Sequence, residues 1–397
     1  MMKRTIIAAI LALATLAAVA QEQQKLRADI VAGPYLQAVT ETGFTVVWIT
    51  DVDAAAWVEV APDDGSHFYA CDRPKYYETV LGKLPVGKLH KVRVEGLEKG
   101  TVYRYRIMQQ ALVSKIGDRK ICFGVSSGND PYSMKPYEVK TLDSSASDCD
   151  FTVCNDIHGR DSLFRLLVAD VRKDSLDFVI FNGDMLSTMD REEQMLDGYL
   201  SSAVELFATN VPFFYARGNH ENRGWFSYRF PDYFPTSNGL PYYIVRQGPA
   251  AILMLDCGED KPDSNESYSG LMRSDEFRAR EAEWIEKAIE SEEFKSAPVK
   301  IAVLHMPPSM EGWHGNLEIG RLIIPVLEKA GIDLMLCGHT HKYSFHEAGE
   351  LGCSFPVLIN SNNEKLNIHI TSDGISAKLI DSDGKLLKEH NFSKPNN

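Results

Sequence analysis

The chain changes its pattern of hydrophobic and polar positions near residue 142. Before that point, apolar residues form short alternating or continuous runs, such as GFTVVWIT at residues 43–50 and TVYRYRIM at residues 101–108, with Gly or Asp-Gly between them. Runs of this length, bounded by turn residues and without a helical period, are typical of β-strands. Their close spacing predicts an all-β sandwich at residues 26–142.

After a small polar link at residues 143–150, apolar runs of strand length alternate with stretches of helical period. The strand-like runs are FTVC, LDFVIF, VPFFYA, AAILMLD, KIAVLH and IDLMLC. Such alternation predicts an α/β domain in which helices pack on sheets. Three further strand-like runs follow residue 353, with SDG turns among them, and predict antiparallel hairpins that extend the second domain over residues 148–397.

Polar side chains that can bind metals or move protons directly follow five of these apolar runs. Open α/β sheets place ligand sites at the carboxyl ends of their strands, so the five loops are expected to meet at one edge. They hold five of the eleven histidines, although they contain a small part of the chain. The residues concerned are Asp156, His158, Asp184, Asn219, His220, His305, His339 and His341.

These side chains are the ligand types of a metal site. Imidazole suits zinc, iron and manganese, and carboxylate or amide oxygens suit harder ions. Without His220 there are seven such groups, more than one tetrahedral ion takes. Two ions that share a carboxylate would use them all, in the arrangement that serves in-line displacement at phosphorus. Singly, His305 could be a hydrogen-bonded core residue, and Asp156 or Asn219 could cap a helix, but the complete set argues for ligands.

The order DxH, GDxxx, GNHE, a lone His and GHxH resembles the calcineurin-like metallophosphoesterases over residues 156–341. In the β-rich segment, VEGLEKGTVYRYRI is similar to a strand–turn–strand of fibronectin type III-like domains. With that segment in front, the mature chain resembles the purple acid phosphatase branch of the superfamily. The resemblance implies a four-layer αββα domain and a metal-dependent phosphoric ester hydrolase of the acid phosphatase kind.

The resemblance also implies a role for each motif residue. The first metal would be held by Asp156, His158 and His341, Asp184 would bridge, and the second metal would be held by Asn219, His305 and His339. His220 would protonate the leaving alkoxide or stabilise charge on the transferring phosphoryl group. A metal-bound hydroxide would attack phosphorus. The cofactors would be two divalent or trivalent ions, for which Fe, Mn and Zn all remain open.

Two positions depart from the purple enzymes. Their first motif is typically DxG, whereas DIH here adds the imidazole of His158. Their second motif carries a tyrosine that gives the colour, and Ser187 in GDMLS takes its place. We therefore expect a colourless enzyme whose first metal site is less selective for ferric iron. A charge-transfer band in the visible spectrum of the purified protein would contradict this expectation.

Three residues outside the ligand set are candidates for substrate contacts. Arg160 and Arg223 closely follow the first and third motifs and could clamp a phosphate oxygen, or they could be solvated residues at helix starts. His314, next to Trp313 in EGWHGN, could line the substrate pocket, although Trp313 could equally serve packing.

Composition constrains the class and location of the protein. Its 397 residues are 44% hydrophobic and 24% charged, as in globular proteins. Residues 1–20 have Lys3 and Arg4, an apolar run and an Ala-Val-Ala end, the layout of a secretory signal peptide. This predicts a periplasmic or secreted protein without a membrane anchor. Cleavage would remove two basic residues and no acidic ones, so the net charge of −13 would become −15, which disfavours binding to nucleic acid backbones.

Seven cysteines at wide spacing, with no CxxC motif, dictate no disulfide framework and make a structural zinc site improbable. In an exported chain, Cys71 could pair with Cys122, or Cys149 with Cys154.

The predicted function is hydrolysis of a small phosphate monoester by an exported dinuclear metalloenzyme. A phosphodiesterase or a nucleotide-diphosphate hydrolase is the alternative among enzymes, because the pocket walls that decide between them are not readable from the sequence. A binding or adhesion protein with an inactive hydrolase domain is the alternative of another class, and the complete set of ligand positions argues against it. The oligomeric state stays open.

Overall fold

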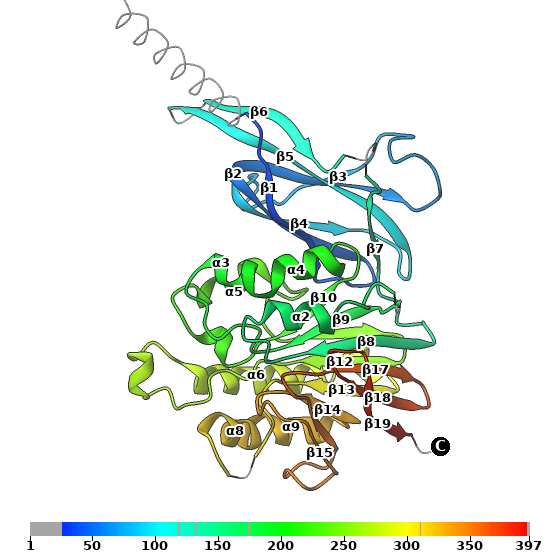
Figure 1. Cartoon of the computed structure of the whole chain (residues 1–397), viewed down its shortest axis with the longest axis vertical. Helices are drawn as coiled ribbons and strands as arrows, with labels where there is room; N and C mark the ends of the chain where they lie inside the picture. The colour runs from blue at the N-terminus through cyan, green and yellow to red at the C-terminus, as the bar shows by residue number, and fades with distance from the viewer. Residues whose placement is uncertain are drawn as a thin grey trace, which may run out of the picture. The chain divides into compact units, whose positions relative to one another are not determined.

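The computed structural model describes residues 26–117, 120–130, 132, 134–173, 175–309 and 311–394. The predicted signal peptide at residues 1–20 lies outside the described residues. The chain forms two compact units (Figure 1). Unit 1 takes in the described parts of Met1–Pro34, Val46–Val94 and Tyr103–Glu138, and unit 2 those of Tyr35–Thr45, Glu95–Val102 and Val139–Asn397.

The N-terminal region is built from strands that pair in one seven-stranded sheet. Its path runs β1-β2-β5-β6, with β3 and β4 paired to β2 and β7 paired to β5. The strands are β1 (Ile30–Gln37), β2 (Gly43–Pro62), β3 (Lys75–Tyr76), β4 (Gly87–Glu95), β5 (Val102–Ile116), β6 (Lys120–Gly128) and β7 (Tyr137–Lys140). An all-β region is thus present where the sequence pattern predicts one. Its kinship with fibronectin type III domains stays a prediction.

A buried histidine in unit 1 gives the stability of this unit an expected pH dependence. His90 is buried, its Nε2 lies 2.9 Å from Thr50 Oγ1, and burial lowers its pKa to about 4. The unfolded chain therefore takes up a proton near the ordinary pKa of 6.5, before the folded unit does. We expect the free energy of unfolding to fall by roughly 1.4 kcal/mol for each pH unit below this value, down to about pH 4. Urea unfolding at pH 7 and pH 5 should show this loss, and a His90→Gln variant should lack it.

Unit 2 contains two six-stranded sheets. The first has the order β10-β9-β8-β17-β18-β19 and the second the order β11-β12-β13-β14-β16-β15. Strands β8, β9 and β10 are parallel in the first sheet, and β12, β13, β14 and β16 in the second. The first sheet consists of β8 (Asp148–Cys154), β9 (Phe178–Asn182), β10 (Phe213–Ala216), β17 (Lys365–Thr371), β18 (Gly374–Ile380) and β19 (Leu386–Ser393). The second consists of β11 (Tyr243–Gln247), β12 (Ala250–Met254), β13 (Val299–Val303), β14 (Leu334–Cys337), β15 (Ser344–His346) and β16 (Val357–Ile359).

The predicted C-terminal hairpins are found for the last two runs, where β17, β18 and β19 pair antiparallel around the SDG turns. The first run, FPVLIN, was expected to join them and does not. It forms β16, which pairs in parallel with β14 in the other sheet. The five residues 360–364 between β16 and β17 carry the chain from one sheet to the other.

Helices cover the outer face of each sheet. They are α2 (Asp161–Leu167), α3 (Glu192–Met195), α4 (Ser201–Ala203), α5 (Phe230–Tyr233), α6 (Ser274–Ala288), α7 (Glu292–Lys295), α8 (His314–Glu318) and α9 (Ile324–Ala330). In the described part of the chain, π-helical segments lie at Leu196–Leu200, Val204–Ala208 and Ile319–Ile323, and 3-10 turns at His220–Asn222, Ser227–Arg229 and Glu266–Tyr268. None of the described helices is long and apolar enough to span a bilayer.

The packing gives unit 2 four layers, in the order helices, sheet, sheet, helices (Figure 1). Phe164 of α2 packs edge-on against Phe181 of β9, with ring centroids 5.6 Å apart. Ile285 of α6 belongs to a buried cluster with side chains of β12, β13, β14 and β16. Between the sheets, the Tyr243 hydroxyl of β11 donates to the Tyr215 carbonyl of β10 at 3.1 Å. All seven cysteines of the chain are free thiols, so neither possible pairing is formed.

Candidate metal centre

The predicted ligand loops come together where the two sheets of unit 2 face each other. Three of the loops follow β8, β9 and β10 of the first sheet, and two follow β13 and β14 of the second. Each begins at the carboxyl end of a parallel strand, as expected for a ligand site in such sheets. Across the sheets, His305 Nε2 lies 3.7 Å from Asp156 Oδ1 and 3.0 Å from Asp184 Oδ2.

Asp156, His158 and His341 form the first cluster of candidate ligands, with ligand atoms within 4.8 Å of one another. His158 Nε2 and His341 Nε2 lie 3.0 Å apart, and both approach Asp156 Oδ1, at 3.7 and 3.2 Å. The second Asp156 oxygen accepts hydrogen bonds from the Asn155 amide and from the His339 backbone, which fix the plane of the carboxylate.

Asp184, His305 and His339 form the second cluster by the same measure. Asn219 joins it, because its Oδ1 lies 3.1 Å from His339 Nδ1. The His305 Nδ1–H donates to the Asn182 carbonyl at 2.6 Å, so Nε2 is the free ligand atom of that ring. A backbone partner that sets the tautomer in this way is typical of metal-ligating histidines.

The two clusters leave buried polar atoms without hydrogen bonds, which is what a metal site requires. Among the described residues, Asp156 Oδ1 and His305 Nε2 are buried and have no hydrogen-bond partner. Buried polar atoms are normally paired, since an unpaired one costs about 1–3 kcal/mol. The oxygen and nitrogen atoms present here therefore fit metal cations, with carboxylate and imidazole donors for both sites.

The charges in the clusters are strongly coupled. Burial alone would raise the pKa of Asp156, but the charge of His305 and the nearby imidazoles of His158 and His341 hold it well below its ordinary value. Burial likewise opposes a proton on His305, yet Asp184 and Asp156 raise its pKa to about 10. The two carboxylates thus stay ionised and demand positive charge nearby, which bound cations would supply.

The ligand loops hold their side chains in an uncommon backbone conformation. Asp156, His158, Asp184, His339 and His341 have φ of 53°, 52°, 53°, 70° and 60°, in the left-handed region. Residues other than glycine adopt such values rarely, at a cost of order 1–3 kcal/mol each, and they cluster at functional sites. Gly218 lets the third loop approach, because a Cβ there would lie 2.3 Å from Asp184 Oδ1.

Glu221 belongs to the site, although its position in the sequence predicts no role as a ligand or a proton donor. It is buried, and its carboxylate accepts hydrogen bonds from the backbone N–H groups of Gly218, Asp184 and Met185 and from the Tyr215 hydroxyl, at 2.8–2.9 Å. It therefore ties the loop that carries Asp184 to the loop that carries Asn219. The available signal was the acidic residue that completes GNHE directly behind a buried strand.

A Glu221→Gln variant should lose stability and metal affinity together. All four partners of the carboxylate are donors, so the new amide N–H₂ must face donors and leave one or two of them unpaired. We expect a loss of about 2 kcal/mol in unfolding free energy, and weaker metal binding because Asp184 is displaced. Denaturant unfolding and metal titration would measure both. Glu205→Gln, at an exposed ion pair, is the matched control and should change neither by much.

His220 lies beside both clusters and is oriented by a backbone carbonyl. The His220 Nδ1–H donates to the Ser187 carbonyl at 2.7 Å, and Nε2 lies 3.8 Å from Asp184 Oδ2. Arg223 Nη1 is 3.0 Å from the same Nε2, while its other guanidinium nitrogens pair with the buried carboxylates of Glu259 and Asp260. The structure thus brings Arg223 next to His220.

The other two candidates for substrate contacts have partners within the fold. The guanidinium of Arg160 donates to the carbonyls of Ile157 and Asp156 and to the Asn363 side chain, at 3.0, 2.8 and 2.9 Å, beneath the first ligand loop. His314 begins α8, and its Nε2 lies 2.7 Å from an Asp275 carboxylate oxygen on α6. Neither side chain is among the residues of the two clusters.

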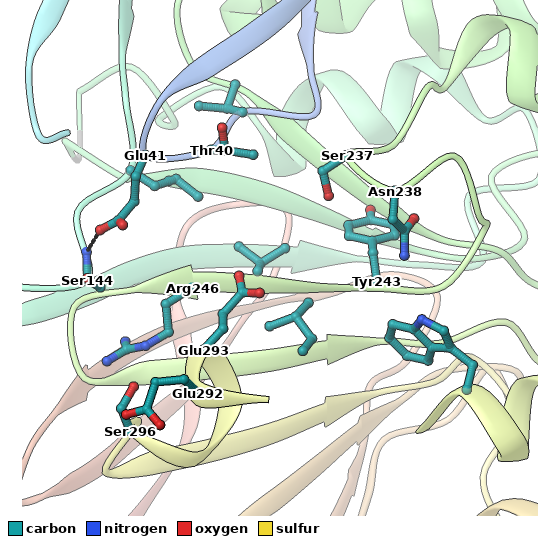
Figure 2. Close-up of a pocket in the computed structure, with 15 residues that line it drawn as sticks. Thr40, Glu41, Ser144, Ser237, Asn238, Tyr243, Arg246, Glu292, Glu293 and Ser296 are labelled. Atoms are coloured by element: carbon teal, nitrogen blue, oxygen red, sulfur yellow. Dashed lines mark hydrogen bonds between the residues drawn. The ribbon is translucent and has the colours of Figure 1, made fainter. Parts of the chain in front are cut away.

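Two cavities of unit 2 differ in their relation to this centre. One, of about 320 Å³, includes His158 and Ser187 in its walls. Another, of about 390 Å³, is lined by Glu41, Arg246 and Glu293 among others, and by none of the candidate ligands. Figure 2 shows these polar groups around the second cavity, with the Glu41 carboxylate accepting from the Ser144 backbone N–H. The first cavity is therefore the one that adjoins the candidate metal centre.

Comparisons with known proteins agree with this geometry. The probable glycerophosphodiester phosphodiesterase GpdQ of Arcobacter nitrofigilis is 32% identical over 179 residues, which cover 42% of this chain and 58% of that protein. Purple acid phosphatase 21 of Arabidopsis thaliana is 24% identical over 271 residues, which cover 65% of this chain and 53% of that protein. The chain thus spans little more than half the length of these curated relatives.

The fold also has a counterpart among solved structures. Purple acid phosphatase PPD1 from yellow lupin (Lupinus luteus) seeds matches with a TM-score of 0.63 and 15% identity, over 91% of this chain and 74% of that one. At this identity the likeness concerns the fold. Residues 150–343 match the profile of the family described as calcineurin-like phosphoesterase. The part of unit 2 that carries both ligand clusters is therefore similar to the calcineurin-like phosphoesterase family.

Proposed function

We propose that the protein is an exported phosphatase that hydrolyses small phosphate monoesters with the help of two metal ions. The observation that carries the proposal is the pair of ligand clusters, which meet where His305 lies close to both Asp156 and Asp184. Buried ligand atoms of the two clusters have no hydrogen-bond partner. The first ion would be held by Asp156, His158 and His341, and the second by Asn219, His305 and His339, with Asp184 shared between them. When bound, two cations supply Lewis-acid polarisation of the phosphoryl group and a more acidic water.

The residues of the chain contribute orientation and proton transfer. Because the Ser187 carbonyl can only accept, Nδ1 of His220 carries a hydrogen. Nε2, which accepts from Arg223 Nη1, is then the atom that would take up and release the proton that moves during the reaction. That atom lies close to Asp184 and is in reach of a leaving oxygen on a phosphorus bound at the centre. Arg223 places a fixed positive charge beside it, which would attract a negatively charged phosphoryl oxygen bound at the centre.

Hydrolysis of phosphodiesters is the second candidate, favoured by one comparison. The relative with 32% identity bears a phosphodiesterase name, whereas the relative that matches over 65% of this chain bears a phosphatase name. Both reactions use the same displacement at phosphorus and differ in whether the site tolerates a second ester group.

The mature chain, residues 21–397, should be loaded in turn with Mn²⁺, Zn²⁺ and Fe²⁺ and assayed on a nitrophenyl phosphate monoester and the matching diester. Monoester turnover that requires the metal supports the proposal, and diester turnover alone supports the second candidate. Failure to bind metal with no turnover of either ester would refute both and revive a binding or adhesion role. Export is tested separately, by the presence of the chain lacking residues 1–20 outside the cytoplasm.

A further inference from the structure

We propose that the cavity beside His158 binds the alcohol part of the substrate and selects a polyhydroxylated leaving group such as a sugar. This inference rests on the proposed phosphatase function and names the class of ester on which it acts. The cavity has a volume of about 320 Å³, enough for a monosaccharide and in the range of small-molecule sites.

The cavity and the metal centre share residues, so a group bound to phosphorus would extend from one into the other. His158 belongs to the first ligand cluster and also lines the cavity. Ser187 lines it too, and its carbonyl orients His220 while its hydroxyl oxygen lies 3.4 Å from His158 Nδ1. A leaving oxygen near His220 therefore has this cavity as adjacent space.

The walls of the cavity combine apolar surface with polar side chains that offer both donors and acceptors. Gln194 uses its Oε1 to accept the backbone N–H groups of Asp190 and Arg191, so its amide nitrogen has both hydrogens available. The Thr188 hydroxyl donates to Asp190, which leaves its oxygen free to accept. Asp197 adds a carboxylate and Arg191 a guanidinium, whereas Leu186 is the apolar side chain of the wall.

This wall fits hydroxyl groups better than an apolar or aromatic group. Each hydroxyl of a sugar donates once and accepts, so it can satisfy a carboxylate and an amide at the same time. An alkyl or aromatic group of the same size would cover these polar groups without pairing them, at a cost in binding. The exposed Trp225 and Trp313, which could stack on a nucleobase, do not line this cavity.

The backbone of one wall departs from the regular α-helix. Leu196–Leu200 is π-helical, with the Ser201 N–H bonded to the Leu196 carbonyl, and it carries Asp197 and Gly198 into the cavity wall. A Cβ on Gly198 would lie 2.7 Å from a Leu186 methyl carbon and 3.3 Å from Gly159 Cα. Such π turns are rare and are found frequently at functional sites, which agrees with a wall shaped for a ligand.

The test compares three phosphate monoesters that differ only in the leaving group: glucose 6-phosphate, n-hexyl phosphate and 4-nitrophenyl phosphate. The wild type should prefer glucose 6-phosphate over n-hexyl phosphate by at least about tenfold in kcat/KM. Asp197→Leu and, independently, Thr188→Val should remove most of this preference, because kcat/KM should fall for glucose 6-phosphate and rise for n-hexyl and 4-nitrophenyl phosphate. Glu205→Leu, at an exposed acidic residue that does not line the cavity, is the matched control and should change none of the three rates.

A wild type that prefers n-hexyl phosphate, or variants whose three rates are unchanged or fall in parallel, would overturn the inference. Those outcomes leave the proposed function intact, because 4-nitrophenyl phosphate is still hydrolysed. A metal-loaded wild type that hydrolyses none of the three esters would instead refute the proposed function and the inference with it. The two variants alter side chains of different type, so a folding defect in one does not remove the test.

Discussion

Replacing Asp184 by Asn is expected to abolish binding of the second metal and to lower kcat/KM on phosphate esters by about 10³-fold or more. The Asp184 carboxylate is buried, its Oδ2 lies 3.0 Å from His305 Nε2, and its Oδ1 accepts the His220 backbone N–H at 2.9 Å. Asn keeps the shape and can keep that hydrogen bond, but it removes the charge. A thousandfold loss corresponds to about 4 kcal/mol of transition-state stabilisation, a size expected when a bridging ligand is lost.

Metal analysis of the purified variant and steady-state kinetics measure both parts of this prediction. Asp190→Asn is the control, because Asp190 lies on the same loop, is exposed and belongs to neither cluster. An Asp184→Asn protein with two metals per chain and a normal rate would show that this carboxylate is not a ligand. It would then also remove the basis for a shared bridge between the two clusters.

Replacing His220 by Gln is expected to lower kcat by about 10²–10⁴-fold while the metal content stays unchanged. His220 is not part of either cluster, so its loss should spare both metals. If its Nε2 supplies a proton to the leaving oxygen, the loss should be large for an alkyl phosphate, whose alkoxide is a poor leaving group. It should be small for a nitrophenyl ester, because nitrophenolate departs without protonation.

The comparison of leaving groups separates two roles for His220. A proton donor predicts unequal losses on the two esters, whereas stabilisation of charge on the phosphoryl oxygens predicts similar losses on both. The pH profile of kcat should also lose its alkaline limb in the variant if a proton donor has been removed. Equal and full activity of His220→Gln on both esters would exclude either role.

Sequence patterns were sufficient for the elements that lie in buried parallel strands and for the side chains at their ends. The runs FTVC and IAVLH predicted β8 and β13, and Asp156 and His305 behind them lie 3.7 Å apart although 149 positions separate them in the chain. The prediction is possible because an unbroken hydrophobic run indicates a strand that is buried on both faces, and because the loops that follow parallel strands lie at one edge of the sheet. The roles given to these residues stay predictions.

The remaining features depend on tertiary packing that no local pattern reveals. Glu221 looks like a solvated acidic residue in the sequence, and its importance comes from four donors supplied by three different segments. Arg160 closely follows DIH and could have been a phosphate ligand or a solvated residue at a helix start, and the pattern did not show that its guanidinium donates to the carbonyls around it. The π-helical form of Leu196–Leu200 also has no signature in a pattern that reads as an ordinary amphipathic helix.

Because the ligand loops have a left-handed backbone, the residues that would bind the metals are not those that would make the metal-free protein most stable. In the metal-free protein nothing repays the conformational cost at positions such as His158 and His341, and glycine would relieve it. Directed evolution for heat resistance in the presence of a chelator would therefore accumulate glycine at these positions and produce sturdier but inert proteins. The same selection with metal present would keep the histidines, because the bound ion stabilises the folded protein only as long as its ligands are retained.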